Sequence, residues 1–456
     1  MIQSPDLRPY QIDAIGSWQA NDYRGLLEMA TGTGKTITAL SCARVLLKEK
    51  GQLVILVLVP TLDLSVQWAS EVRTWFSNNI ILANSKTKNW YKECMEMLNT
   101  DRATFTIIST YATFLTTKFQ HLVTMLPNET LLIGDEVHNF GTLKHISLYP
   151  QHIPFRLGLS ATPDRYFDET GSAALNTYFN VTEQPTYRFG MKEAIAAGFL
   201  CEYYYYPKLV SLTTSELTEY KEISQKLMRF FDTKAGKLID SPAVTALLLK
   251  RKRIIHQAAG KLPVFKEIMT TLVEDFGLLK YLLVYVPEGN DIQIDEDDIR
   301  LIDQYSAIIT RDFKLSQHQY IGGTANRENI LDQFAKGKIS VLTAMKCLDE
   351  GVDVRRAEIA VFCSSTGNPR QFIQRRGRIL RTHPDKKFAT IYDLVVVPEI
   401  TDQYFEDTLQ MEKSILQGEF RRVHEFAGLA LNKYQALASI DAKAREFEID
   451  VFSPFS

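Results

Sequence analysis

The segment Met29-Ala-Thr-Gly-Thr-Gly-Lys35-Thr36 is the most informative part of this chain for its fold. Apolar residues lead into it, and a helical pattern follows it. Its two glycines let backbone N–H groups turn inward, where they and a helix N-terminus can surround phosphate oxygens. We interpret it as a phosphate-binding loop in which Lys35 neutralises phosphates and the Thr36 hydroxyl holds Mg²⁺. Because Met29 takes the place of the usual first glycine, an ordinary glycine turn is the alternative.

A second stretch, Asp135-Glu-Val-His138, supplies the partner that such a loop needs. It follows Thr130-Leu-Leu-Ile-Gly134, an apolar run that predicts a buried parallel strand. Open α/β sheets bind ligands at the carboxyl ends of their strands. Asp135 can therefore hold Mg²⁺, while Glu136 orients and deprotonates an attacking water. The alternative is a solvated acidic turn, which the phosphate loop upstream makes less attractive.

Composition bounds the class of protein. At 456 residues the chain exceeds the size at which one hydrophobic core keeps growing, so we expect two or more domains. A hydrophobic content of 45% and a charged content of 23% are ordinary for a globular protein. The formal net charge of −2 excludes a wholly basic nucleic-acid coat protein, but not a local basic groove.

Cysteine usage and the N-terminal sequence suggest a compartment. None of the five cysteines forms a C-x-x-C pair, so neither a disulfide framework nor a zinc site is expected. The start Met1-Ile-Gln-Ser-Pro-Asp6 lacks the pattern of a signal peptide. No apolar run approaches the ~20 residues that span a bilayer. We expect a soluble cytoplasmic protein with no membrane partner.

Strands and helices alternate along most of the chain, which predicts α/β architecture with doubly wound parallel sheets. In the first half the helical patterns cover 36–50 and 64–76, and the strand patterns cover 53–59, 105–109, 130–134 and 155–159. In the second half the strand patterns cover 281–286, 339–343, 358–362 and 388–392. The second half has no phosphate loop, so it cannot hydrolyse a nucleotide by itself.

The stretches that join and follow these two halves carry less chemistry. Cys201-Glu-Tyr-Tyr-Tyr-Tyr-Pro207 is interpreted as the crossing between domains. Its tyrosines could stack on bases, but a strand packed on a sheet is the favoured reading. Residues 213–275 are helical and contain the basic run Lys250-Arg-Lys-Arg253, either a solvated face or a nucleic-acid contact. Residues 401–447 form an amphipathic helical tail.

Several polar residues near the predicted strand ends have two readings. The Gln11 amide offers the donor and acceptor that read adenine, although an exposed glutamine is the plain alternative. Thr61 and Thr110 lie just past strands, where a hydroxyl can bond a nucleic-acid phosphate or cap a helix. Ser160-Ala161-Thr162 could link the acidic pair to a moving neighbour, or cap a helix.

The second half contains Gly351-Val-Asp353 and an arginine-rich segment that ends at Arg381. In a helix, Gln374, Arg378 and Arg381 fall at i, i+4 and i+7, and therefore on one face. Such a row is often merely solvated. Opposite a phosphate site, however, arginines act as fingers worth roughly 10³–10⁵ in rate.

The order of these motifs resembles the superfamily 2 helicases and translocases over roughly residues 7–395. The Asp-Glu-Val-His form (a DEVH box), the phosphate loop and Gln-Arg-Arg-Gly-Arg-Ile-Leu-Arg look like one branch in particular. That branch holds XPB-type DNA repair helicases and the motor subunits of type I and type III restriction enzymes. The resemblance implies two RecA-like domains, at 1–208 and 276–400, with ATP between them and nucleic acid crossing both. A helical insertion would occupy 209–275 and a helical segment 401–456.

The resemblance also assigns residues to roles. Catalysis would fall to Glu136, Lys35, Gln374, Arg378 and Arg381. Nucleotide binding would fall to Arg8, Gln11, Thr31, Gly32, Thr33, Gly34, Lys35, Thr36, Gly351 and Asp353, and Mg²⁺ to Thr36 and Asp135. Coupling of hydrolysis to motion would fall to His138, Ser160, Ala161 and Thr162. Nucleic-acid contacts would fall to Thr61, Thr110 and Thr343.

One departure from the family weakens the last assignment. Many relatives have Thr-Asp before the Gly-x-Asp segment, where this chain has Met345-Lys346, so Thr343 is only a candidate replacement. The expected function is an ATP-dependent DNA helicase or double-strand DNA translocase, within DNA repair or a restriction and phage-defence system. The alternatives are an ATP-gated nucleic-acid clamp without net travel, and an RNA helicase. The preference for DNA over RNA rests on the branch resemblance, and no nuclease signature is present, so a partner would have to cut.

Overall fold

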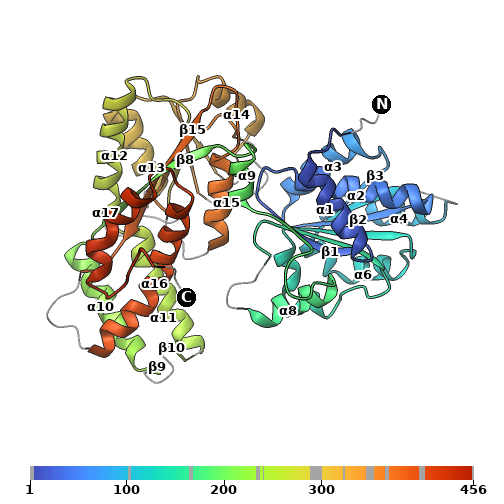
Figure 1. The fold of residues 1–456 in the computed structure, drawn as a ribbon, viewed down its shortest axis with the longest axis horizontal. Coiled ribbons are helices and arrows are strands. Elements are labelled where there is room, and N and C mark those ends of the chain that lie inside the picture. The colour runs from blue at the N-terminus through green and yellow to red at the C-terminus, as the bar shows by residue number, and fades with distance from the viewer. Residues whose placement is uncertain are drawn as a thin grey trace. The chain divides into compact units, whose positions relative to one another are not determined.

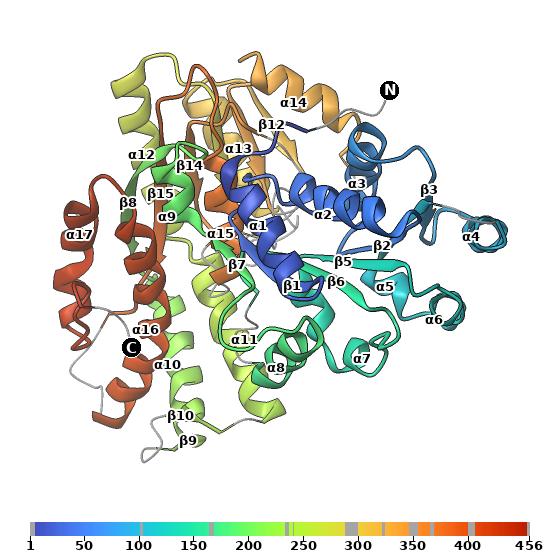
Figure 2. The ribbon, with the colours of Figure 1, turned by 45° about the vertical axis from the view of Figure 1, so that its right-hand side comes forward.

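The computed structural model describes residues 5–100, 104–163, 168–232, 237–239, 241–287, 300–321, 324–345, 354–364, 369–399 and 406–453. The chain divides into two compact units, Met1–Leu200 and Cys201–Ser456, which are drawn in Figures 1 and 2. Within the described ranges, no helix is both long and apolar enough to cross a membrane.

The first unit is built on a seven-stranded sheet in the order β3-β4-β2-β5-β6-β1-β7. Every neighbouring pair of these strands is parallel. The central strand β2 reads VILVLV and is buried at each position, as expected for a strand covered on both faces. The strands are β1 (Arg24–Met29), β2 (Val54–Val59), β3 (Ile80–Ala83), β4 (Phe105–Thr110), β5 (Thr130–Asp135), β6 (Phe155–Ser160) and β7 (Tyr187–Phe189).

Helices cover both faces of this sheet (Figures 1 and 2). The group α1, α2 and α3 lies on one side, and α6 and α8 lie on the other. The helices are α1 (Pro9–Ala20), α2 (Lys35–Lys50), α3 (Leu62–Trp75), α4 (Trp90–Leu98), α5 (Tyr111–Phe114), α6 (Thr117–Thr124), η1 (Val137–Gly141), α7 (Leu143–Ile146), α8 (Glu169–Tyr178) and α9 (Met191–Ala196). Strand ends carrying Met29 and Asp135 are therefore brought to the same edge of the sheet.

The second unit is built on a six-stranded sheet in the order β12-β13-β11-β14-β15-β8. All of its neighbouring strands are parallel as well. The strands are β8 (Glu202–Val210), β11 (Leu282–Tyr285), β12 (Gln317–Tyr320), β13 (Val341–Ala344), β14 (Ile359–Phe362) and β15 (Phe388–Val396). The doubly wound parallel α/β fold expected from the sequence is confirmed in both units.

The tyrosine-rich stretch forms β8, which pairs along its whole length with β15. Tyr203 and Tyr205 are fully buried, and Tyr206 stacks on Tyr392 at 5.2 Å. The favoured reading, a strand packed on a sheet, is confirmed.

Helices and one short hairpin complete the second unit. The hairpin joins β9 (Phe231–Asp232) and β10 (Lys237–Leu238). The helices are α10 (Thr214–Met228), α11 (Pro242–Gln257), α12 (Lys261–Phe276), α13 (Leu301–Ala307), η2 (Ile308–Asp312), α14 (Arg327–Ala335), α15 (Pro369–Ile379), α16 (Glu406–Gly428) and α17 (Lys433–Arg445).

Of the two readings of the basic run of α11, a solvated face does not hold for all four residues. Arg251 is buried and ion-paired with Glu412 of α16, which is also buried. Tyr220 and Ser224 of α10 donate to the same carboxylate, at 2.7 and 2.8 Å. The other three basic residues of the run are exposed. A buried ion pair thus fastens the C-terminal helix α16 to the helical insertion.

Candidate active site

The phosphate loop joins β1 to α2, and its backbone has the shape that the glycines predicted. Gly32 and Gly34 have φ values of 86° and 87°, which L residues rarely adopt. A Cβ on Gly34 would lie 2.7 Å from Nε2 of Gln11 and would displace that amide, while the positive φ is what requires glycine there. The loop therefore leads backbone N–H groups to the N-terminus of α2.

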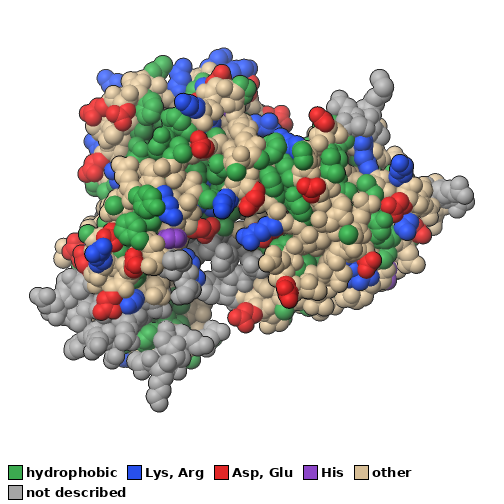
Figure 3. Space-filling model, in the orientation of Figure 1, with side chains coloured by type: hydrophobic (Ala, Val, Ile, Leu, Met, Phe, Trp, Pro, Cys, Tyr) green, Lys and Arg blue, Asp and Glu red, His purple; other side chains and the backbone are tan. Residues whose placement is uncertain are grey.

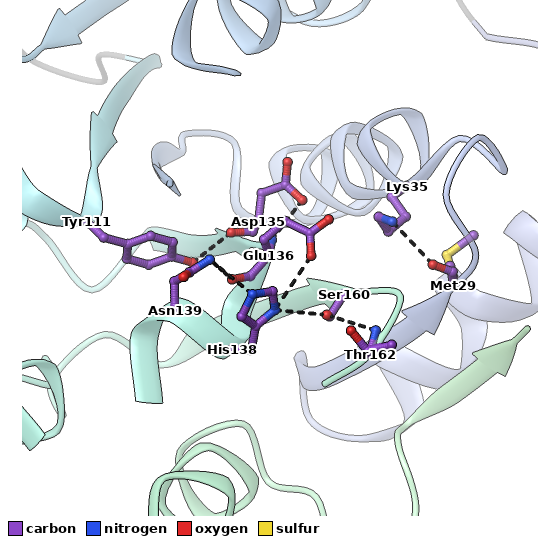
Figure 4. A network of polar contacts seen from close by, with 9 residues as sticks. All are labelled: Met29, Lys35, Tyr111, Asp135, Glu136, His138, Asn139, Ser160 and Thr162. Atoms are coloured by element: carbon purple, nitrogen blue, oxygen red, sulfur yellow. Dashed lines mark hydrogen bonds and ion pairs between the residues drawn. The ribbon is translucent and has the colours of Figure 1, made fainter. Parts of the chain in front are cut away.

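Lys35 is the first residue of α2, where the helix dipole already favours anions. Its Nζ donates to the Met29 carbonyl at 3.3 Å (Figure 4), and Thr36 follows in the first turn. The buried Oγ1 of Thr31 has no hydrogen-bond partner among the described residues. A glycine cradle, a helix N-terminus and a lysine together fit a polyphosphate.

Helix α1 contacts the loop through two of its first residues, Tyr10 and Gln11. Tyr10 donates to the Thr33 carbonyl at 2.5 Å and stacks on Phe189 at 3.9 Å. Gln11 accepts from the Arg8 N–H at 3.0 Å and donates to the Gly34 carbonyl at 3.3 Å. An amide has two donor hydrogens and two acceptor lone pairs, so these bonds leave capacity for a base.

The acidic pair follows β5, as predicted, and both carboxylates are buried. Oδ2 of Asp135 accepts from the indole of Trp68 at 2.8 Å, and Oδ1 accepts from the Glu136 N–H at 3.0 Å. Oε2 of Glu136 has no hydrogen-bond partner among the described residues. The Asp135 side chain is held in place, whereas the Glu136 carboxylate keeps an acceptor for a proton.

Electrostatics link the acidic pair to the loop. Burial, followed by the Glu136 charge, raises the pKa of Asp135 to about 6, while Lys35 and the Trp68 hydrogen bond act in the opposite direction. Adjacent buried carboxylates are costly unless a cation neutralises them. Oxygen ligands of this kind are what Mg²⁺ prefers, so the donor set fits that ion.

A chain of polar contacts leads from the acidic pair to the end of β6 (Figure 4). Nδ1 of His138 lies 3.6 Å from Oε2 of Glu136 and 3.4 Å from the Ser160 hydroxyl. The Ser160 hydroxyl also accepts from the Thr162 N–H at 3.1 Å. Because the next helix, α8, is capped by Asp168, the helix-cap reading of this tripeptide is wrong. Ala161 is the residue between the two hydroxyls.

The threonines expected to touch nucleic acid differ from one another. Thr61 and Thr110 cap α3 and α5 through their hydroxyls, so the cap role weighed for each is confirmed. Thr343 is fully buried, and its hydroxyl donates to Gln317 at 3.2 Å. The nucleic-acid contact expected for Thr343 is therefore wrong, because its hydroxyl is used inside the sheet.

The arginine-rich segment forms α15, which ends at Ile379. Gln374 and Arg378 share its face and are buried, whereas Arg381 lies beyond the helix. The expected three-residue row is thus wrong at its last member. Gly351 and Asp353, expected to bind nucleotide, lie outside the described residues.

Two other arginines of this segment point into their own unit. Arg375 donates to the carbonyl and the hydroxyl of Ser364, at 3.2 and 2.8 Å. Arg376 bonds the Glu425 carbonyl at 3.2 Å and lies over the Phe426 ring at 4.3 Å. These two arginines anchor α15.

Sequence reasoning missed three residues that hold the acidic pair, two of which come from other elements. Trp68 comes from α3, and Tyr111 donates its hydroxyl to the Asp135 carbonyl at 2.9 Å. Asn139 donates to the Glu136 carbonyl at 3.0 Å. The position of Tyr111 and Asn139, just past strands β4 and β5, was the only signal in the sequence.

Comparisons with known proteins agree with this geometry. The family model "Type III restriction enzyme, res subunit" matches residues 4–165, and "Helicase conserved C-terminal domain" matches residues 279–383. The first match contains the phosphate loop and the acidic pair, and the second contains the whole of α15 and its arginines.

Relatives are similar over most of the chain. A DNA 3'-5' translocase XPB2 of Sulfurisphaera tokodaii is 29% identical over 385 residues, which cover 82% of this chain and 79% of the relative. A putative helicase of a Sulfolobus islandicus filamentous virus is 21% identical and covers 86% of this chain. An uncharacterised protein of Mycobacterium tuberculosis is 24% identical, and this chain spans 61% of it.

Solved structures show the same fold. The chain resembles the ATP-dependent Type ISP restriction-modification enzyme LlaBIII bound to DNA, with a TM-score of 0.61, 18% identity, and coverage of 94% of this chain and 31% of that one. It also resembles the Pyrococcus furiosus Hef helicase domain, with a TM-score of 0.53, 17% identity, and coverage of 87% and 97%. A restriction-enzyme res-subunit model matched in the first unit, a helicase C-terminal model matched in the second and the translocase relative together support a superfamily 2 helicase, an ATP-hydrolysing enzyme with two RecA-like domains.

Proposed function

We propose that this enzyme is an ATP-dependent motor on double-stranded DNA, either a helicase or a translocase. The observation that supports ATP hydrolysis most directly is the buried Asp135–Glu136 pair beside the loop that carries Lys35. The preference for duplex DNA is supported by the names of the relatives, a DNA translocase and a restriction enzyme bound to DNA. It is also supported by the DEVH form of the acidic motif and the branch that this form resembles.

In the proposed reaction, the chain's residues divide the work on ATP. Gln11 reads adenine with its remaining donor and acceptor, and the loop N–H groups with Lys35 hold the phosphates. Mg²⁺ at Thr36 and Asp135 would neutralise charge on the phosphate oxygens. Oε2 of Glu136 accepts the proton of the attacking water.

Two further groups complete the proposed turnover. Arg378 and Arg381 stabilise the charge that develops on the γ-phosphate, as arginine fingers do. His138 contacts both the Glu136 carboxylate and the Ser160 hydroxyl, so a change in the charge or position of that carboxylate moves Ser160 and Thr162 through the imidazole. A conformational step can follow hydrolysis only if some group contacts different partners before and after it, and His138 already lies between two.

A hydroxyl that caps a helix can still donate to a nucleic-acid phosphate, which is the contact proposed for Thr61 and Thr110. Each hydroxyl accepts from an N–H of its own helix. The Thr110 hydroxyl also contacts the Thr113 hydroxyl at 3.0 Å, where either oxygen can donate, whereas the Thr61 hydroxyl retains its own hydrogen as a donor. That hydrogen suits a phosphate oxygen, which only accepts. Such contacts carry little base information, so they serve a motor that travels on any sequence.

Two rival functions share the same motifs. An ATP-gated clamp would hydrolyse ATP on DNA without moving, and an RNA helicase would prefer RNA over duplex DNA. If the enzyme serves restriction or phage defence, cleavage would come from a nuclease partner.

The experiment compares steady-state ATP hydrolysis with duplex DNA, single-stranded DNA and RNA at fixed salt, beside displacement of a third strand from a DNA triplex. We expect the largest stimulation by duplex DNA, together with triplex displacement. Hydrolysis without displacement supports the clamp, and stronger stimulation by RNA supports the RNA helicase.

A further inference from the structure

Glu136 has an unusual backbone conformation for a residue of its type. Its φ is 46° and its ψ is 54°, in the left-handed region that L residues other than Asn and Asp seldom occupy. Such conformations persist only where neighbouring groups hold them, and they cluster at active sites. Since the side chain leaves from this turn, the backbone here sets where the carboxylate points.

Hydrogen bonds fix the peptide groups on both sides of Glu136. On its N-terminal side, Tyr111 Oη donates to the Asp135 carbonyl at 2.9 Å. On its C-terminal side, the N–H and Nδ2 of Asn139 both donate to the Glu136 carbonyl at 3.0 Å. Of these donors, Tyr111 alone comes from the end of a different strand, β4. Its hydrogen bond therefore connects the Glu136 turn to another part of the sheet.

The sequence around the strand end makes room for this hydroxyl. A Cβ on Gly134 would lie 3.1 Å from Tyr111 Oη, and equally close to Cγ2 of Val137. Most side-chain contacts of a Cβ are wider than this, so an alanine would push the hydroxyl away. Glycine at the penultimate position of β5 therefore permits the approach of the tyrosine to the Asp135 carbonyl.

Tyr111 is itself held rigidly. It is buried, and its ring packs against Phe140 at 5.6 Å. Its carbonyl contacts Nε2 of His145 at 3.1 Å, and Nδ1 of His145 contacts the Thr142 hydroxyl at 2.6 Å. A fixed ring places the hydroxyl without a large loss of side-chain freedom on bonding.

The hydroxyl also stays protonated beside two carboxylates. Burial raises the pKa of Tyr111 well above its ordinary value, and the charges of Asp135 and Glu136 raise it further. It therefore remains a hydrogen-bond donor over the whole working range of pH.

We propose that Tyr111 is a positioning residue for ATP hydrolysis, whose hydroxyl holds the Asp135–Glu136 peptide so that the Glu136 carboxylate keeps the direction drawn in Figure 4. The inference rests on the proposed role of Glu136 as the group that activates water. Tyr111 touches neither water nor phosphate in this role, and acts through the backbone alone.

The first test is Tyr111→Phe, which removes one oxygen and keeps the ring. Outer partners of catalytic carboxylates and metal ligands typically contribute about 10–100-fold to activity, so we expect kcat for ATP to fall by about that factor with little change in KM. The matched control is Tyr178→Phe. Tyr178 is buried in the same core, and its hydroxyl donates to the Pro150 carbonyl at 3.3 Å.

A double-mutant cycle separates positioning from general damage. In a Glu136→Gln background, Tyr111→Phe should not lower the residual turnover further, because the group it positions no longer acts as a base. A merely structural role would lower turnover in both backgrounds. Equal kcat values for Tyr111→Phe and Tyr178→Phe would also overturn the proposal.

Two further measurements keep the result interpretable. Thermal unfolding checks that Tyr111→Phe is folded. If it is not, Asn139→Ala takes its place with the same expectations; this change removes the Nδ2 bond to the Glu136 carbonyl together with the Nδ2 contact to Nε2 of His138. If Glu136→Gln retains full turnover, the proposed function of that carboxylate fails. If Glu136→Gln is inactive and Tyr111→Phe behaves as wild type, only the positioning inference fails.

Discussion

The indole of Trp68 donates a hydrogen bond to Oδ2 of Asp135 over 2.8 Å, and both side chains are buried. Helix α3, which begins at Leu62 just after the strand end of β2, thereby contacts the carboxylate expected to hold Mg²⁺. A hydrogen bond to a charged acceptor contributes about 1.5–3 kcal/mol, more than a neutral one. The bond favours the ionised form of Asp135, against burial and the charge of Glu136.

Trp68→Phe should therefore shift the pH dependence of ATP hydrolysis. Without the indole donor the pKa of Asp135 rises above its value of about 6. Activity requires the ionised form of Asp135. As the solution is acidified, Trp68→Phe loses this form at a higher pH than the wild type, so the acid limb of the kcat/KM profile shifts to higher pH. Trp18→Phe is the control, because that indole donates at 3.0 Å to the Arg156 carbonyl, away from the carboxylates. An unshifted acid limb would remove this role from Trp68.

Arg381→Ala should lower kcat far more than it weakens ATP binding. Arginine fingers act on charge that develops in the transition state, and their removal costs roughly 10³–10⁵ in rate. The measurements are steady-state hydrolysis and equilibrium binding of ATP. Lys387→Ala, an exposed cation close by in the chain, is the control for general loss of charge. Proportional losses in rate and affinity would show that Arg381 only binds the nucleotide.

His138→Ala should reduce the coupling between hydrolysis and motion. The imidazole lies 3.6 Å from Oε2 of Glu136 and 3.4 Å from the Ser160 hydroxyl, so its loss breaks the contact path between β5 and β6. We expect triplex displacement per ATP hydrolysed to fall by more than hydrolysis itself. His152→Ala is the control. That exposed ring contacts the Val123 carbonyl, which is not part of the contact path between β5 and β6. An unchanged displacement per ATP would contradict the coupling role.

Arg251→Ala should destabilise the second unit by about 3–5 kcal/mol, because it leaves the Glu412 carboxylate buried without its partner. Lys252→Ala, one residue along the same run, should change stability by at most about 0.5 kcal/mol, since Lys252 is exposed. Urea unfolding of both variants makes the comparison. Similar midpoints for the two would show that Arg251 is not a structural anchor.

Local patterns were enough to predict much of the fold and the phosphate site. The apolar runs of β2 and β5 identify buried parallel strands, and Gly32, Gly34 and Lys35 lie together because the loop is one continuous segment. The acidic pair follows its strand at the predicted edge. Each of these features is specified within a few residues of sequence.

Features set by distant residues could not be predicted in the same way. Helical spacing placed Arg381 on one face with Gln374, but α15 ends at Ile379. Lys386 donates to the carbonyl of Ile379 and, at 2.8 Å, to that of Arg381. These carbonyls therefore have a hydrogen-bond donor without a further turn of helix. Nothing in the segment itself signals this ending.

The same limit applies to buried polar groups. Arg251 sits in a run of four basic residues, and only the packing of α16 distinguishes it from its neighbours. Trp68 and Tyr111 look like core aromatics in the sequence, since an aromatic ring buries well with or without a partner for its polar atom. Their contacts with Asp135 appear only when the strand ends are assembled.

The most direct test of the account is ATP hydrolysis by wild type and by Glu136→Gln, measured with and without duplex DNA, beside equilibrium binding of ATP to both proteins. The account predicts DNA-stimulated turnover in the wild type, and a glutamine variant that binds ATP normally but keeps only a small residual turnover. Glutamine keeps the shape of the side chain and cannot accept the proton of water. A Glu136→Gln enzyme that still hydrolyses ATP at the wild-type rate on DNA would contradict the central claim.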